Sequence, residues 1–201
     1  YKDHVGGIVT GPVQRFERSD IIVDLEDGEG IMPAKERVQS ENYQIGDRIR
    51  FLLLGLESPT GGHQVVLSRA HPEFIRKLFE LEVAEIADGT VEIRGIAREA
   101  GFRTKIAVHS RDEKVDPVGA CVGLRGQRVK NIVRELSGEK VDIVKWSPDI
   151  KTFVTNALAP AKLMRLEVDE DANSVKVIVE GDQLSLAIGK KGQNARLTAK
   201  L

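Results

Sequence analysis

The chain contains 201 residues, of which 41% are hydrophobic and only 4% aromatic, so small cores of Val, Ile and Leu are expected. Its 30 Lys and Arg residues nearly balance 31 Asp and Glu residues, and the net charge of −1 excludes a globally basic nucleic-acid binder while allowing locally basic surfaces. Cys121 is the single cysteine, which excludes an internal disulfide and favours a reducing compartment.

Residues 1–69 predict a small all-β barrel. The stretch "IIVDLE" alternates between two faces with period two, as a half-buried strand does. Two further apolar stretches, "DRIRFLLLGLE" and "HQVVLS", predict strands that a loop from Ser58 to Gly62 joins, and a brief helical stretch is expected near Ala34 to Val38. Several short strands of this kind favour a closed or half-closed OB-type barrel.

Residues 70–147 predict an α+β unit that begins with a helix. Pro72 suits the first helical position, and the apolar residues after it share one helical face: Phe74, Ile75, Leu78 and Phe79. Strands are expected over residues 90–99 and 103–110. Apolar residues at helical spacing then predict two helices on either side of residues 123–126, and "EKVDIVKW" predicts a closing strand.

The same pattern restarts over residues 148–201. A shift of 66 positions superimposes "IGKKGQ", residues 188–193, on "VGLRGQ", residues 122–127. An internal duplication explains this agreement better than two coincidental turns do. The shift also places the second closing strand at 205–213, beyond Leu201, so the second unit is predicted to be truncated.

Each unit carries Gly-x-x-Gly between two helices, a turn that suits a phosphate group. Glycine lets the backbone approach a phosphodiester closely, and the following helix directs amide donors and its positive dipole end at the same place. Arg125, Lys190 and Lys191 lie between the glycines, within windows free of acidic residues. One such turn more often serves close packing, but two copies in register favour two KH domains of the prokaryotic type, whose turns clamp about four nucleotides of a single strand.

The sequence also resembles the NusA family of bacterial transcription termination/antitermination factors. Similar stretches include "HPEFIRKLFELEVAEI", "DPVGACVGLRGQRV" and "EGDQLSLAIGKKGQNARL", and the resemblance covers essentially the whole chain. It implies a factor that binds single-stranded RNA and modulates pausing, termination and antitermination in the cytoplasm. It also implies RNA polymerase as a partner, mainly through an N-terminal domain missing here, with other Nus factors and ribosomal proteins as further candidate partners.

Carried over by position, the resemblance implies RNA contacts at both turns. The residues concerned are Gly123, Leu124, Arg125, Gly126, Arg128 and Lys130 in the first unit, and Gly189, Lys190, Lys191, Gly192 and Arg196 in the second. KH domains hold bases in a groove between the helix beside the clamp and the sheet edge. This nominates Val122, Ile132 and the strand "RTKIAV" in the first unit, and Ile188 in the second.

The barrel is similar to the RNA-binding fold of ribosomal protein S1. Barrels that bind RNA well stack bases on aromatic residues of their second and third strands, but "DIIVDLE" and "GIMPAKE" contain none. The nearest candidates are Phe16 and Phe51 for bases and Arg15, Arg48 and Arg50 for phosphates. Because residues 1–70 hold 8 basic and 11 acidic residues, a role as spacer or protein contact stays open.

Two other functions stay open at this stage: a protein–protein adaptor whose turns only pack, and the accessory RNA-binding part of an RNA-degrading phosphorolytic enzyme. The enzyme usually places its KH domain before the barrel, the reverse of this order. The four histidines lack metal-ligand spacing and the chain has no P-loop, so no metal, cofactor or catalysis is predicted. No apolar run approaches the roughly 18 residues of a membrane span, and the start at Tyr1 predicts a piece of a longer protein.

Overall fold

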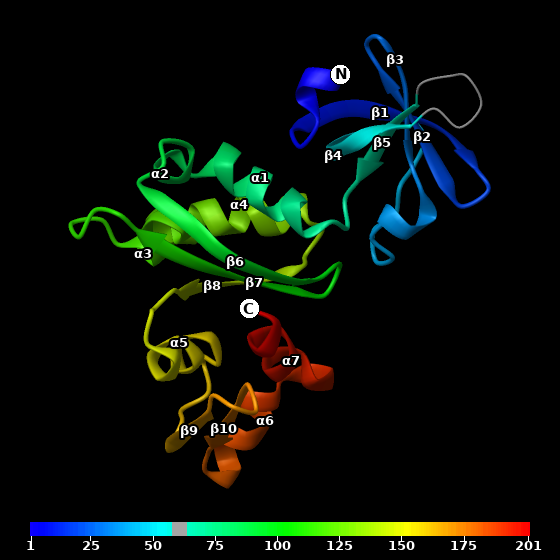
Figure 1. Cartoon of the computed structure of the whole chain (residues 1–201). Coiled ribbons are helices and arrows are strands. Elements are labelled where there is room, and N and C mark those ends of the chain that lie inside the picture. Colours follow the sequence, from blue (N-terminus) through cyan, green and yellow to red (C-terminus); the bar gives the residue numbers. More distant parts are fainter. Residues whose placement is uncertain (58–63) are drawn as a thin grey trace.

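The computed structural model describes residues 1–57 and 64–201, and the predicted loop from Ser58 to Gly62 lies outside these ranges. Figure 1 shows three units that follow one another along the chain: a barrel, a three-stranded sheet covered by helices, and a smaller α+β unit. The predicted fold class, an OB-type barrel followed by two α+β KH units, is confirmed. The bounds 1–69, 70–147 and 148–201 stay predictions.

The barrel closes in the order β1-β2-β3-β5-β4, with β3 and β5 parallel and the other described pairs antiparallel. Gly11 and Gly30 permit this tight closure. A Cβ atom at Gly11 would lie 2.4 Å from the carbonyl oxygen of Asp24, and one at Gly30 would lie 2.7 Å from Cδ1 of Leu67. The strands are β1 (Ile8–Glu17), β2 (Asp20–Leu25), β3 (Gly28–Met32), β4 (Arg48–Glu57) and β5 (Gln64–Ser68).

The first α+β unit begins with α1 (Pro72–Glu82), whose start is set by its sequence. Pro72 occupies the first turn, and the His71 ring nitrogen Nδ1 accepts a hydrogen bond of 3.0 Å from the Glu73 amide. The four apolar residues predicted to share a face are all buried. The remaining elements are α2 (Ala84–Ala87), β6 (Val91–Glu99), β7 (Arg103–Ser110), α3 (Pro117–Val122), α4 (Gln127–Glu135) and β8 (Lys140–Lys145).

The sheet of this unit has the order β6-β7-β8, with β6 and β7 antiparallel and β7 and β8 parallel. The strand β7 is therefore central, and its first six residues, Arg103–Val108, are all buried. Cys121 packs in the core between sheet and helices, where burial raises the pKa of its thiol to about 12. This agrees with the prediction of a core cysteine.

The second α+β unit repeats the order of one helix, two strands and two helices that α1, β6, β7, α3 and α4 form in the first. It contains α5 (Ile150–Ala157), β9 (Arg165–Asp169), β10 (Ser174–Ile178), α6 (Leu184–Ile188) and α7 (Gln193–Lys200), with β9 and β10 paired antiparallel. The longest described helix, α1, has 11 residues, and none of the described helices could cross a membrane.

A buried arginine joins the barrel to the first α+β unit. Arg69 is 2% exposed, and its guanidinium lies 2.7 Å from Oε2 of Glu41 in the barrel and 3.1 Å from Oε1 of Glu135 in α4. Burial opposes ionisation of Glu41, but the hydrogen bonds and charge of Arg69 outweigh it and lower the pKa of that carboxyl. The pairing therefore holds the barrel against the end of α4.

A second buried charge cluster joins the two α+β units. The Lys105 ammonium is fully buried and donates to Oδ2 of Asp142 and to the carbonyl oxygen of Ala157 in α5, each at 2.7 Å. Burial lowers the pKa of Lys105, although Asp142 opposes the shift. On the same sheet face, Arg196 of α7 donates to Glu99 at 2.9 Å. The second unit thus covers the sheet face opposite α1, α3 and α4 (Figure 1).

Candidate nucleic-acid interface

The two Gly-x-x-Gly turns share one backbone conformation. Gly123 has a φ of +78°, and its counterpart Gly189 has a φ of +79°; both combine it with a nearly extended ψ that favours glycine. The third residue of each turn, Arg125 or Lys191, has a φ of +55°. The duplication inferred from the spacing is thus also a duplication of backbone shape.

The first glycine of each turn is required by close packing as well as by its φ. A Cβ atom at Gly123 would lie 2.6 Å from Cγ of Arg128, and one at Gly189 would lie 2.7 Å from Cβ of Asn194. Close packing does not require the second glycine of the first turn, because a Cβ atom at Gly126 would meet nothing closer than 3.7 Å. The second glycines of both turns keep a left-handed conformation immediately before α4 and α7.

The turns present basic side chains to solvent. Arg125, Lys190 and Lys191 are exposed, and in the described part of the chain none of them has a carboxylate oxygen within 4.0 Å. Leu124, between the first pair of glycines, is 85% exposed. Each turn therefore offers unpaired positive charge beside its glycine backbone.

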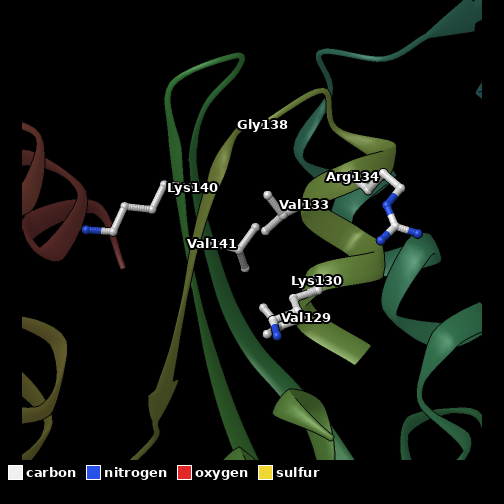
Figure 2. A pocket seen from close by; sticks show the side chains of 7 residues that line it. All are labelled: Val129, Lys130, Val133, Arg134, Gly138, Lys140 and Val141. Carbon is white, nitrogen blue, oxygen red and sulfur yellow. The ribbon is translucent and has the colours of Figure 1, made fainter. Parts of the chain in front are cut away.

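A groove of about 490 Å³ lies between the edge strand β8 and α4, the helix that follows the first turn. Figure 2 shows Val133 of α4 facing Val141 of β8 across it, with Lys130 on the same helix. Its lining residues are Val129, Lys130, Val133, Arg134, Gly138, Lys140 and Val141. An apolar floor with cations at its rim suits bases below and phosphates above.

Protein-family models match both α+β units: a NusA-like first KH domain covers residues 69–146, and a NusA-like second KH domain covers residues 150–201. The chain belongs to the NusA family. It is 52% identical over 199 residues to the transcription termination/antitermination protein NusA of Halalkalibacterium halodurans, and 51% identical over 199 residues to that of Bacillus subtilis. The NusA protein of Mycobacterium tuberculosis is 48% identical over 205 residues.

These alignments cover 99%, 99% and 98% of this chain, but only 52%, 54% and 59% of the respective NusA relatives. The chain therefore spans somewhat more than half the length of these three relatives. The barrel and the two KH units of this chain correspond to the aligned part of each relative.

Two groove predictions in the first KH unit are wrong. The strand "RTKIAV" is central rather than at the edge, and the second KH unit covers its outer face. Ile132 is 3% exposed and belongs to the core. The groove instead uses β8 and the flank of α4 that carries Val129 and Val133. Their i, i+4 spacing was a signal for this second flank.

The other predicted groove residues lie closer to their expected places. Val122 is half-buried at the end of α3, immediately before the first turn. Ile188 is 43% exposed and lines an apolar hollow of about 740 Å³ in the second KH unit. Val154, Val168 and Val177 line the same hollow from α5, β9 and β10.

Two arginines predicted to contact RNA are paired within the protein. Arg128 donates to Oε2 of Glu85 at 2.6 Å and to the carbonyl oxygen of Ala120 at 2.7 Å. Arg196 donates to Glu99 and, at 3.1 Å, to the carbonyl oxygen of Lys191. Both side chains therefore hold the turns in place, whereas Lys130 stays exposed at the groove rim.

The barrel candidates divide by burial and pairing. Phe51 is fully buried among the barrel core residues, so the prediction that it stacks on bases is wrong. Arg15 lies 3.0 Å from both Glu17 and Glu29, which neutralise it. Phe16 is 40% exposed, and Arg48 and Arg50 lie exposed on β4.

Proposed function

We propose that this chain binds single-stranded RNA through its two KH units, as part of a factor that modulates pausing, termination and antitermination by bacterial RNA polymerase. The observation that carries the proposal is the duplicated turn, with unpaired cations at Arg125, Lys190 and Lys191 beside apolar grooves. The names of the NusA relatives support the transcriptional role. The proposed activity is non-enzymatic and cytoplasmic.

In this proposal the turns hold the RNA backbone and the grooves read bases. Exposed cations on a turn neutralise phosphates, so affinity falls as salt rises. The apolar floor formed by Val129, Val133 and Val141 receives bases and provides what sequence preference there is. Lys130 and Arg134 at the rim add phosphate contacts.

RNA polymerase is the second proposed partner. Because the chain spans only part of its relatives' length, the proposal assigns polymerase contacts mainly to a domain outside this chain. Other Nus factors and ribosomal proteins are further candidates. Phe16, Arg48 and Arg50 offer the barrel a weak RNA surface at most, since its other candidates are buried or paired.

The test is fluorescence anisotropy of a labelled random-sequence RNA of about 16 nucleotides, long enough for two clamps of about four nucleotides each, across a salt series. The variant combines Arg125→Asp with Lys190→Asp, and the matched control combines Lys35→Asp with Lys114→Asp, two exposed lysines away from the turns. We expect the turn variant to lose at least about tenfold in affinity while the control binds as the parent does.

Other outcomes point to other functions. Equal binding by the parent and both variants would move the RNA to the barrel. No binding by the parent would favour the protein–protein adaptor. Faster phosphorolysis of the RNA by an added RNA-degrading phosphorolytic enzyme when this chain is present would favour the accessory part of such an enzyme.

A further inference from the structure

The hairpin between β6 and β7 lies where all three units meet. Ser40 of the barrel approaches Gly101 so closely that a Cβ atom there would lie 2.4 Å from the serine Oγ. The Gly101 amide donates to Oε1 of Glu139 at 2.6 Å. Arg103, at the start of β7, donates to Oδ1 of Asn194 in the second KH unit at 3.4 Å. Contacts to three sides therefore fix the backbone of this hairpin.

Phe102 occupies the tip of this fixed hairpin and is 55% exposed. Its carbonyl oxygen accepts a hydrogen bond of 3.1 Å from the amide of Lys140, so the two residues are neighbours across the sheet edge. The Lys140 side chain is exposed and has no carboxylate within 4.0 Å among the described residues. A residue with an exposed aromatic ring and a residue with an unpaired cation are thus joined through their backbones.

This pair lies between the first groove and the second turn. Lys140 lines the end of the first groove, and Figure 2 shows its side chain directed away from Val141. On the other side, Glu99 of the same hairpin binds Arg196, whose guanidinium also donates to the carbonyl oxygen of Lys191 in the second turn. The segment that contains Phe102 and Lys140 therefore lies on a direct route from the first groove to the second turn.

We propose that Phe102 and Lys140 form a third RNA subsite between the two clamps, in which a nucleobase stacks on the Phe102 ring and the Lys140 ammonium binds a neighbouring phosphate. The inference rests on the proposed RNA-binding function and names residues that would bind the RNA between its two clamps. Stacking on an aromatic face tolerates any base, so this subsite contributes affinity and register rather than sequence preference.

The rigidity of the hairpin supports binding at this place. A stacking residue on a mobile loop loses conformational entropy when it binds, whereas the residues on both sides of Phe102 are held by contacts of Gly101, Glu99 and Arg103. The same contacts fix the separation of the two turns. A rigid connection raises the effective concentration of the second clamp once the first is occupied.

The experiment compares Phe102→Ala, Phe102→Leu and Phe102→Trp on two labelled random-sequence RNAs, one of about 16 nucleotides and one of about 5, which fits a single clamp. Anisotropy measures the long RNA. Shifts of the Gly126 and Gly192 amide signals in NMR spectra measure the short one. Leu81→Ala removes a 61% exposed apolar side chain on α1 and is the matched control.

We expect Phe102→Ala and Phe102→Leu to lose about tenfold in affinity for the long RNA, as stacked aromatics do, and to bind the short RNA as the parent does. Phe102→Trp retains the affinity for long RNA, because it preserves the aromatic face. Lys140→Gln lowers the salt dependence for the long RNA alone.

The outcomes separate this subsite from the clamp function. If Arg125→Asp with Lys190→Asp abolishes binding but Phe102→Ala and Phe102→Leu bind long RNA like the parent, the clamps stand and the subsite is refuted. If Phe102→Leu binds the long RNA as tightly as Phe102→Trp does, residue 102 makes an apolar contact with the RNA and the proposed stacking is refuted. If the parent binds neither RNA, both proposals fail together.

Discussion

The two KH units carry the same turn but support it differently. Arg128 in the first unit and Asn194 in the second are equivalent by the 66-residue shift, and each lies under the first glycine of its turn. Arg128 donates to the Ala120 carbonyl and Asn194 to the equivalent Leu186 carbonyl, at 2.7 and 3.0 Å. The backbone contact is duplicated, whereas the rest of the support has diverged.

The divergence lies in what else each side chain reaches. Arg128 extends to Glu85 within its own unit, where it is partly exposed. Asn194 is fully buried, donates to the Leu158 carbonyl at 3.0 Å and faces Arg103 of the first KH unit. The first turn is therefore held by its own unit, and the second turn is held partly by its neighbour. Changes at the interface should reach the second turn first.

The largest expected effect comes from filling the space under the turns. Gly189→Ala should destabilise α7 by about 3 kcal/mol, since it combines a glycine-only backbone conformation with a Cβ overlap on the Asn194 backbone nitrogen, at 2.8 Å. Gly123→Ala should cost about 1 kcal/mol less, because its overlap is with the Arg128 side chain alone. Amide hydrogen exchange in α7 and α4 measures both.

The control for this pair is Gly138→Ala, which also has a positive φ but open space around its Cβ position. It should cost only about 1 kcal/mol. If Gly138→Ala proves as costly as Gly189→Ala, backbone conformation alone explains the requirement and the close packing is irrelevant.

The next effect removes the side chains that hold the turns. Asn194→Ala should cost about 2 kcal/mol, because two buried carbonyls, at Leu158 and Leu186, lose their donor. Arg128→Ala should cost about 1 kcal/mol, since its ion pair with Glu85 is partly exposed. Shifts of the urea midpoint measure both changes.

Asn194→Asp sharpens this test. The carboxylate retains an acceptor for Arg103 but loses both donors to the carbonyls. We expect it to be at least as destabilising as Asn194→Ala. A milder effect would show that the contact with Arg103, rather than the two carbonyl bonds, holds the second turn.

A smaller effect concerns the salt dependence of RNA binding. Each phosphate contact on a single strand contributes about 0.7 to the slope of log K against log salt concentration. Arg125→Gln should therefore reduce the slope by about 0.7, and the pair Lys190→Gln and Lys191→Gln by about 1.4. Equal reductions by the two variants would mean that one of the lysines in the second turn does not contact phosphate.

The smallest expected effect is on acid stability. The pKa of Glu85 is lowered, first by its own backbone amide and then by Arg128. A lowered folded pKa gives stability that is present above the ordinary value near 4.5 and is lost as the pH falls through the folded pKa. Urea midpoints at several pH values should thus fall less steeply on acidification for Glu85→Gln than for the parent.

Asn194 is neutral, so Asn194→Ala should shift the urea midpoint equally at every pH. The pH dependence of the urea midpoint therefore distinguishes the support of the first turn, which contains the titratable Glu85, from that of the second turn, which contains the neutral Asn194. A pH-dependent loss in Asn194→Ala would reveal that protonation of Asp142, the partner of nearby Arg103, affects the second turn.

Several features of the site could be predicted because they depend on neighbours along the chain. Helical spacing indicated α3, α4 and α6. The positive φ angles of Gly123 and Gly189 each belong to one short turn, so they depend only on residues close in the sequence. The duplication was visible as a constant shift in residue number. The exposure of Arg125, Lys190 and Lys191 followed from their place between the glycines.

The errors arose where distant segments pair. Phe51 alternates with Arg50 along β4, but which of the two faces the core depends on how the barrel closes. Arg196 looked free in a basic window, and its partner Glu99 lies 97 residues earlier. The strand "RTKIAV" became central because β8 pairs parallel to it from beyond two helices.

By itself, the sequence determined the two turns, their glycines, their cations and the order of barrel and KH units, because these depend on local backbone preferences and on periodicity. Only the tertiary structure decided which flank of α4 faces the groove, which arginines form internal pairs, and that a hydrogen bond joins the backbones of Phe102 and Lys140. Such choices depend on strand pairing and domain docking, which bring together residues that no local pattern links.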